Sequence, residues 1–246
     1  MKQLQTSVLG YTVYGGDLSQ VPLSKQTVIN TLNGHSYTVA KNDSLFKKAL
    51  NTSDVLLPDG VSVVFAARLL KGQKIQKIAG TDIFIHLLEK LEKEKGSCFF
   101  LGASKQTLNL IQERLTAEYP SVGFGAFSPA FKDSFNEVES KLMCDAVNAF
   151  NPIVLFVGMT APKQEKWIYN NKYRLDANII CAIGAVFDFY AGTTERPAQW
   201  VLDLKLEWLG RLLKEPKRMW YRYLVSTPEF FVDLFIEKIK NLVTSH

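Results

Sequence analysis

Strand-like and helix-like segments alternate along most of this chain, and that alternation constrains the fold more than any other feature. Short apolar runs rich in β-branched or aromatic residues lie at 7–14, 27–31, 54–57, 98–101, 123–127, 153–157 and 179–183. Helical patterns lie between most of them, at 35–50, 61–70, 82–95, 105–119, 135–150 and 162–174. Because such alternation builds βαβ units, we predict an α/β protein with a mostly parallel sheet and helices on both faces.

The pattern changes after Gly192. Residues 193–246 read as helices without another convincing strand. We therefore expect an α/β domain at 1–192 and a helical appendage at 193–246. With 246 residues, 47% of them hydrophobic, the chain can bury a full core.

Targeting and metal-binding signals are missing from the sequence. No apolar run reaches the roughly 18 residues that a spanning helix needs, and the first residues lack the apolar stretch of a signal peptide. We expect a cytoplasmic protein. Cys98, Cys144 and Cys181 lie far apart, without histidines at metal-ligand spacing. We expect reduced, buried thiols and no metal site.

Four expected strands run into turns that contain glycine, namely Gly60, Gly102, Gly158 and Gly184. A glycine lets backbone N–H groups approach a ligand, and the helix that follows adds partial positive charge at its amino end. Together these turns indicate a rim for an anionic ligand such as a nucleotide diphosphate. The alternative is that each glycine only makes a tight turn.

The usual nucleotide and catalytic motifs do not occur. There is no G-x-G-x-x-G after the first strand, no P-loop, no H-E-x-x-H, no G-x-S-x-G and no D-x-D pair that could hold a divalent cation on a diphosphate. A bound diphosphate would therefore depend on backbone amides and on lysine or arginine side chains.

A basic, aromatic segment at 205–223 offers such cations. It carries six basic residues and two acids, and its aromatic residues are of the type that lies at a headgroup boundary. The basic residues are Lys205, Arg211, Lys214, Lys217, Arg218 and Arg222. Pro216 is expected to start a helix that places Arg218 and Arg222 on one face. We favour a membrane surface as the partner over nucleic acid, since no nucleic-acid module is present. A solvated charged face remains the alternative.

Several motifs in order carry a family resemblance. They are PDG at 58–60, AGTD at 79–82, FLGAS at 100–104, VGMTAPKQEKWI at 157–168, IGAVFDFYAG at 183–192 and RPAQWVLDLKLEWLGRLLKEPKRMWYRYL at 196–224. Over residues 7–225 the chain resembles the WecG/TagA/CpsF glycosyltransferases. The resemblance implies a Rossmann-like fold and an inverting, metal-independent transfer that uses no cofactor.

The resemblance also implies the substrates. A uridine diphosphate (UDP) sugar would donate N-acetylmannosamine, N-acetylmannosaminuronic acid or glucose to a saccharide on a polyprenyl diphosphate, in cell-surface polysaccharide synthesis. The enzyme would be peripheral on the inner face of the bacterial cell membrane, without nucleic acid, and would form homo-oligomers. The alternatives are a UDP-sugar-binding membrane adaptor without catalysis and a UDP-sugar hydrolase.

The resemblance assigns roles to individual residues. Asp59 would be the general base, with Thr31 and Asn33 orienting the sugars, although a Pro-Asp-Gly sequence is also an ordinary turn. Arg211, Arg218 and Arg222 would stabilise the leaving diphosphate. The expected substrate-binding residues are Lys77, Gly80, Thr81, Asp82, Gly102, Ala103, Gly158, Gln164, Glu165, Gly184 and Asp188. Lys77 stands where the family usually has an arginine. A lysine keeps the positive charge but cannot make the two parallel hydrogen bonds of a guanidinium group.

Overall fold

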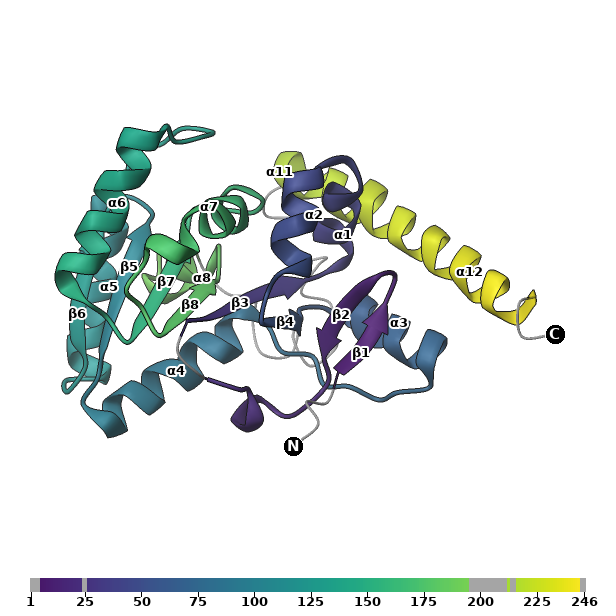
Figure 1. Ribbon diagram of the computed structural model, residues 1–246, viewed down its shortest axis with the longest axis horizontal. Coiled ribbons are helices and arrows are strands. Elements are labelled where there is room, and N and C mark those ends of the chain that lie inside the picture. Colours follow the sequence, from purple (N-terminus) through teal and green to yellow (C-terminus); the bar gives the residue numbers. More distant parts are fainter. Residues whose placement is uncertain (1–4, 24–25, 195–211, 213–215, 244–246) are drawn as a thin grey trace.

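The computed structural model describes residues 5–23, 26–194, 212 and 216–243 (Figure 1). The described chain contains a six-stranded parallel sheet in the order β4-β3-β8-β7-β5-β6. Its strands are β3 (Thr27–Leu32), β4 (Val55–Pro58), β5 (Ser97–Gly102), β6 (Gly123–Phe127), β7 (Val154–Gly158) and β8 (Ile179–Ala182). The predicted α/β, Rossmann-like architecture is confirmed.

The run at 7–14 is not one strand, as expected, but a separate hairpin. β1 (Gln5–Val8) pairs antiparallel with β2 (Tyr11–Tyr14). Leu9 and Gly10 make the turn between them with φ values of 49° and 82°. Two residues at positive φ are the turn geometry that matches the twist of a tight hairpin. The expectation was wrong because leucine gives no turn signal at this position.

The helix expected at 35–50 is two helices. α1 (Gly34–Asn42) and α2 (Ser44–Asn51) are separated by Asp43, whose backbone is extended. The Asp43 carboxylate accepts a hydrogen bond of 2.9 Å from the backbone N–H of Phe46 and so caps α2. A short acidic side chain satisfies the free N–H groups of a helix start better than it supports a helix interior.

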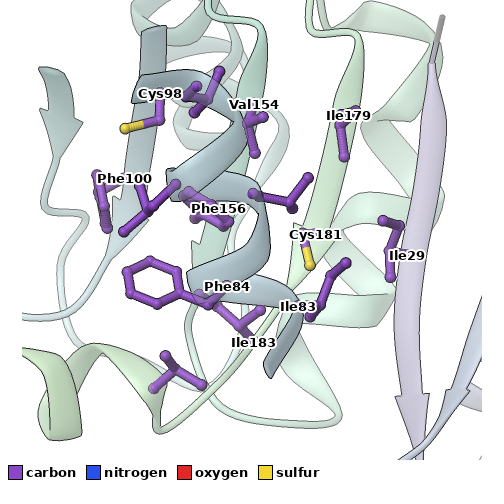
Figure 2. Close-up of a cluster of buried hydrophobic side chains, with 14 of the residues drawn as sticks. Ile29, Ile83, Phe84, Cys98, Phe100, Val154, Phe156, Ile179, Cys181 and Ile183 are labelled. Atoms are coloured by element: carbon purple, nitrogen blue, oxygen red, sulfur yellow. The ribbon is translucent and has the colours of Figure 1, made fainter. Parts of the chain in front are cut away.

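Helices cover both faces of the sheet, because neighbouring residues of each strand point to opposite sides. On one face α4 (Gly80–Glu94), α5 (Lys105–Glu118) and α8 (Val186–Tyr190) form a core with the strands. Figure 2 shows Phe84 of α4 beside Phe156, with ring centroids 4.9 Å apart. On the other face lie α6 (Glu137–Phe150) and α7 (Lys163–Asn171). The three cysteines are free and buried, as predicted.

The C-terminal helices of the described chain contribute to a further hydrophobic cluster, separate from those on the two faces of the sheet. After α11 (Pro216–Trp220) and a π-helical segment (Tyr221–Ser226), α12 (Thr227–Val243) packs against α1 and α3 (Val61–Lys71). Figure 1 shows α12, in yellow, beside α1 with its far end extending past the other elements. Phe230 and Leu234 are fully buried in this cluster. No helix of the described chain is both long and apolar enough to cross a membrane.

The packing of α12 predicts a large stability difference between two phenylalanines on the same helix. Phe230→Ala should lower the free energy of unfolding by about 3 to 5 kcal/mol, because a fully buried ring is removed. Phe235→Ala is the matched control, since Phe235 is 51% exposed, and should cost under about 1 kcal/mol. Urea unfolding of both variants measures the difference. Equal losses would mean that α12 does not pack against α1 and α3 in solution.

Candidate active site

A cavity of about 860 Å³ lies over the carboxyl edge of the parallel sheet. Since all six strands run in the same direction, their carboxyl ends and the amino ends of the following helices meet at this edge. β5 and β7 are neighbours in the sheet. The chain passes from β5 to β6 on one side of this pair and from β7 to β8 on the other side, so the two connections run in opposite directions. A divergence of this kind opens a crevice where ligands bind in α/β sheets. The volume suits a small-molecule ligand.

The cavity brings together twelve of the residues that the sequence singled out. They are Thr31, Asn33, Asp59, Gly80, Thr81, Ala103, Gly158, Gln164, Glu165, Gly184, Asp188 and Arg222. They come from the ends of five strands and the turns or helices that follow them, from the start of α4 and from the π-helical segment. Residues up to 191 positions apart in sequence thus form one site.

Five expected site residues are not among the described residues that line the cavity. Lys77 and Asp82 are exposed and do not line the cavity. The Asp82 carboxylate accepts a hydrogen bond of 2.8 Å from the backbone N–H of Ala79 and caps α4. Gly102 is buried behind the cavity wall. Arg211 and the side chain of Arg218 lie outside the described residues.

Packing explains two of the strand-end glycines. At Gly102, φ is +125° and a Cβ atom would lie 2.4 Å from the carbonyl oxygen of Gly158. At Gly158, a Cβ atom would lie 2.5 Å from the Phe187 ring. Both glycines are therefore needed for the close approach of β5, β7 and α8, and this need exists without a ligand. Gly158 nevertheless lines the cavity.

Asp59, Thr31 and Asn33 are held together by the pairing of β3 with β4. Thr31 lies opposite Leu57 in the register, and the backbone N–H of Asp59 donates 2.8 Å to the carbonyl of Leu32. Asn33 caps α1, since its Oδ1 accepts 3.0 Å from the backbone N–H of Ser36. That bond orients the side chain and leaves its amide NH₂ available to donate to a ligand. A carboxylate, a hydroxyl and an amide donor therefore share one end of the cavity.

Gln164 and Glu165 form a buried polar pair below the end of β7. The side chain of Gln164 accepts 3.2 Å from the backbone N–H of Met159 and donates 2.8 Å to Oε1 of Glu165. Both residues are 3% exposed. Among the described residues Oε2 of Glu165 has no hydrogen-bond partner. Burial raises the pKa of Glu165 to about 7, so a substantial fraction of this carboxyl is neutral near neutral pH.

The raised pKa of Glu165 predicts a pH-dependent loss of stability that Glu165→Gln should remove. In the unfolded chain the carboxyl ionises near its ordinary value of 4.5, and in the folded protein near 7. The contribution of this group to stability is therefore fully present below pH 4.5 and falls as the pH rises to 7, by about 2 to 3 kcal/mol. The variant should lack that fall. Denaturant unfolding between pH 4.5 and 8 measures it.

The exposed Glu113 of α5 provides the control for this prediction. Glu113→Gln should keep the pH profile of the wild type. If the Glu165→Gln profile also matched the wild type, then Glu165 would ionise normally in the folded protein.

One wall of the cavity was not expected from the sequence. The segment after β6 contributes Ser128, Pro129, Ala130, Phe131 and Phe135 to the lining. Lys163 holds this wall, since its Nζ donates 2.7 Å to the carbonyl of Lys132 and lies 5.4 Å from the centre of the Phe131 ring. No glycine follows β6, so the pattern used for the other strand ends could not indicate it. The available signal was the position of β6 at the same edge.

Positive charge reaches the cavity from three described side chains, Lys105, Lys163 and Arg222. The amino ends of α4, α5 and α7 also lie at the cavity, through Gly80, Lys105 and Lys163. The exposed N–H groups of a helix start favour anions. Within the described residues no cluster of three or more His, Cys, Asp or Glu side chains could hold a metal ion.

Two cavity residues have backbone conformations that L-amino acids rarely adopt. Ala103 has φ of 57° and Thr160 has φ of 70°. Such conformations cost about 1 to 3 kcal/mol each and persist where the surrounding structure enforces them, often at functional sites. They follow β5 and β7, where the connections diverge.

The π-helical segment carries Arg222 into the cavity and is fastened to α1. The Oγ1 of Thr38 donates 2.8 Å to the carbonyl of Ser226, and Nδ1 of His35 lies 2.9 Å from the hydroxyl of Ser226. Burial, and next the charge of Arg222, lower the pKa of His35 to about 4, so this imidazole is neutral at neutral pH. π-Helical turns occur frequently at functional sites.

Comparison with known proteins places the chain in a family. Residues 16–243 match the model of the glycosyl transferase WecG/TagA/CpsF family. The chain therefore belongs to this family of glycosyltransferases, as its motifs indicated.

Three similar proteins share one name. The chain is 30% identical over 211 residues to the N-acetylglucosaminyldiphosphoundecaprenol N-acetyl-beta-D-mannosaminyltransferase of Bacillus subtilis, with 86% of this chain and 80% of that protein covered. It is 28% identical to the enzyme of the same name from Bacillus spizizenii, covering 84% of this chain and 78% of the relative. For the enzyme of that name from Staphylococcus aureus (strain MW2) the identity is 26%, covering 78% and 73%.

Proposed function

We propose that this protein transfers N-acetylmannosamine from a UDP-sugar to N-acetylglucosamine carried on a polyprenyl diphosphate, with inversion and without a metal ion. The observation that carries the proposal is the cavity in which Asp59 lies with Thr31, Asn33 and Arg222, in a chain whose relatives are named for this transfer onto an undecaprenyl-linked acceptor. The chemistry belongs to cell-surface polysaccharide synthesis.

In the proposed reaction, Asp59 acts as the general base. It takes the proton from an acceptor hydroxyl as that oxygen attacks the anomeric carbon of the donor sugar. The new carbon–oxygen bond forms while the bond between the anomeric carbon and the β-phosphate oxygen breaks, and UDP leaves with the negative charge. Attack from the side opposite the leaving group inverts the anomeric centre. Thr31 and Asn33 orient the two sugars.

The leaving diphosphate is stabilised by the protein in this proposal. Arg222, Lys105 and Lys163 line the cavity together with helix amino ends, and these groups favour a diphosphate without a bridging cation. Arg211 and Arg218, which belong to the basic sequence at 205–223, are proposed to add further positive charge. Asp188 is proposed to accept hydrogen bonds from the uridine, and Glu165 and Gln164 to shape the floor of the donor site.

A membrane surface is the proposed location of the reaction. α12 leaves one helical face exposed, with apolar side chains at a spacing of three or four residues. These residues are Val232, Phe235, Ile236, Ile239, Leu242 and Val243. An apolar helical face of this kind, in a chain whose sequence at 205–223 is basic, suits an anionic bilayer, and the proposed acceptor is itself lipid-linked. The inner face of the cell membrane and assembly into oligomers remain predictions of the family resemblance.

A substrate test separates the proposed function from its two alternatives. The protein is given UDP-N-acetylmannosamine with and without N-acetylglucosamine on a short-chain polyprenyl diphosphate, and UDP release is followed. Release that requires the acceptor supports the transfer. Equal release in both cases would indicate a hydrolase, and binding of UDP without any release would indicate an adaptor. N-acetylmannosaminuronic acid and glucose donors, run in parallel, test the sugar.

A further inference from the structure

His35 occupies a position in the cavity wall that the proposed mechanism does not use. It lies in the first turn of α1, two residues after Asn33, and it lines the cavity together with Asp59 and Arg222. Its ring stands edge-on to Tyr221, with centroids 6.3 Å apart. The imidazole is therefore held between α1 and the π-helical segment.

The hydrogen bonds of Ser226 favour a proton on Nδ1 of His35. The Ser226 hydroxyl donates its single proton to the carbonyl of Tyr221 at 3.1 Å. With that proton used, the hydroxyl accepts in its 2.9 Å contact with His35, and Nδ1 is the donor. A neutral imidazole with a proton on Nδ1 has a lone pair on Nε2. The lowered pKa of His35 agrees with a neutral ring.

The Nε2 lone pair has no hydrogen-bond donor among the residues that the structure describes. Within the described chain Nδ1 is the only nitrogen of His35 with a hydrogen-bond partner. At the same end of the cavity, Oδ1 of Asn33 already accepts one hydrogen bond from the backbone of Ser36, and Arg222 can only donate. A sugar that binds there brings several hydroxyl donors and, in an N-acetyl sugar, an amide N–H. If Asp59 receives the reacting hydroxyl, the Nε2 lone pair of His35 is an acceptor for one of the remaining donors.

We propose that Nε2 of His35 accepts a hydrogen bond from the acceptor sugar, from a hydroxyl that does not react or from its acetamido N–H. This inference rests on the proposed function, because that function places the acceptor at the end of the cavity that holds Asp59. The same ring contacts Ser226, so the bound sugar is joined through His35 to the segment that carries Arg222. His35 is thus a binding residue for one substrate and a positioning residue for the C-terminal segment.

Two substitutions distinguish the role of Nδ1 of His35 from that of Nε2. In His35→Asn the side-chain NH₂ takes the place of Nδ1 and can still donate to Ser226, but nothing replaces Nε2. In His35→Gln the side-chain oxygen reaches the place of Nε2, and the donor to Ser226 is lost. His35→Asn should raise the KM for the acceptor about five- to tenfold, the effect of one neutral hydrogen bond, and leave the donor KM unchanged. His35→Gln should keep an acceptor KM closer to the wild type.

The steady-state comparison is made on variants with wild-type melting temperatures. An acceptor KM in His35→Asn equal to that of the wild type, or a rise of the donor KM instead, would overturn the inference. If the wild-type protein itself transfers no sugar, then the proposed function fails, and the assignment of an acceptor sugar fails with it. Transfer by the wild type together with an unchanged His35→Asn variant would contradict the inference alone.

Nitrogen NMR provides a readout that a purely structural role would not change. The chain has 3 histidines, so a protein labelled with ¹⁵N-histidine gives few signals. The His35 signals should show a proton on Nδ1 and none on Nε2, and the short-chain acceptor should shift the Nε2 resonance whereas UDP alone should not. Ser226→Ala should weaken the preference for this tautomer. A proton on Nε2 in the free wild type, or no shift with the acceptor, would overturn the inference.

Discussion

Replacing Asp59 by asparagine is expected to lower turnover by at least about 100-fold, because general-base catalysis contributes roughly 10² to 10⁴ to a rate. Asparagine has nearly the same size and retains an oxygen, but it cannot take the proton from the attacking hydroxyl. The variant should bind UDP as the wild type does. Initial rates with saturating donor and acceptor measure the effect.

The control for Asp59→Asn is Asp145→Asn. Asp145 is exposed on α6 and pairs with Lys141 one helical turn away, an arrangement that contributes little. This variant should keep full turnover. Near wild-type turnover in Asp59→Asn would remove Asp59 from the mechanism and would leave Pro58-Asp59-Gly60 as an ordinary turn.

The second large effect is expected at Arg222. Arg222→Ala should lower turnover by about 100-fold, since loss of one preorganised donor to a developing negative charge costs on the order of 3 kcal/mol. Arg222→Lys should recover part of that loss, because lysine keeps the charge without the two-pronged geometry. Turnover on a water-soluble acceptor analogue is the appropriate measurement, since it does not require membrane binding.

Lys217→Ala is the matched control for Arg222. Lys217 is exposed on α11 and does not line the cavity, so its removal should leave turnover on the soluble analogue unchanged. If Arg222→Ala also kept full turnover but bound vesicles more weakly, then the described C-terminal segment would serve as an anchor only. Arg222 would then contribute nothing to the leaving group.

The sheet could be predicted from the sequence because strands buried on both faces read as short apolar runs. β7 and β8 are such runs, and every expected strand from 27 onward has a counterpart in the sheet. The hairpin of β1 and β2 was missed because the positive φ of Leu9 is a property of the turn and not of leucine. The break at Asp43 was missed because the apolar spacing continues across it.

The site could be predicted in part, for a physical reason. In a parallel sheet every strand end reaches the same edge, so residues after the strands were expected to meet, and twelve of those named line one cavity. Side-chain partners were harder to predict. The contact of His35 with Ser226 joins positions 191 apart, and no local pattern indicates it. Asp82 was expected to bind a ligand, whereas its position in the first turn of α4 suits a cap.

The buried side of α12 was also hard to predict from the sequence. Its sequence is apolar on more than one side, and periodicity did not show which side would be buried. The structure buries Phe230 and Leu234 and exposes Phe235 and Ile239. The choice depends on the surface formed by α1 and α3, which lie far away in the sequence.

Analysis of the reaction product tests the central claim most directly. The protein is incubated with UDP-N-acetylmannosamine and N-acetylglucosamine on a short-chain polyprenyl diphosphate, in the presence of a chelator that removes divalent cations. Mass spectrometry and the carbon–proton coupling at the anomeric centre then identify the product. We expect one N-acetylhexosamine added per acceptor, an equal amount of UDP and an inverted, β-configured linkage. Absence of this product, a retained configuration or a need for added magnesium would contradict the account.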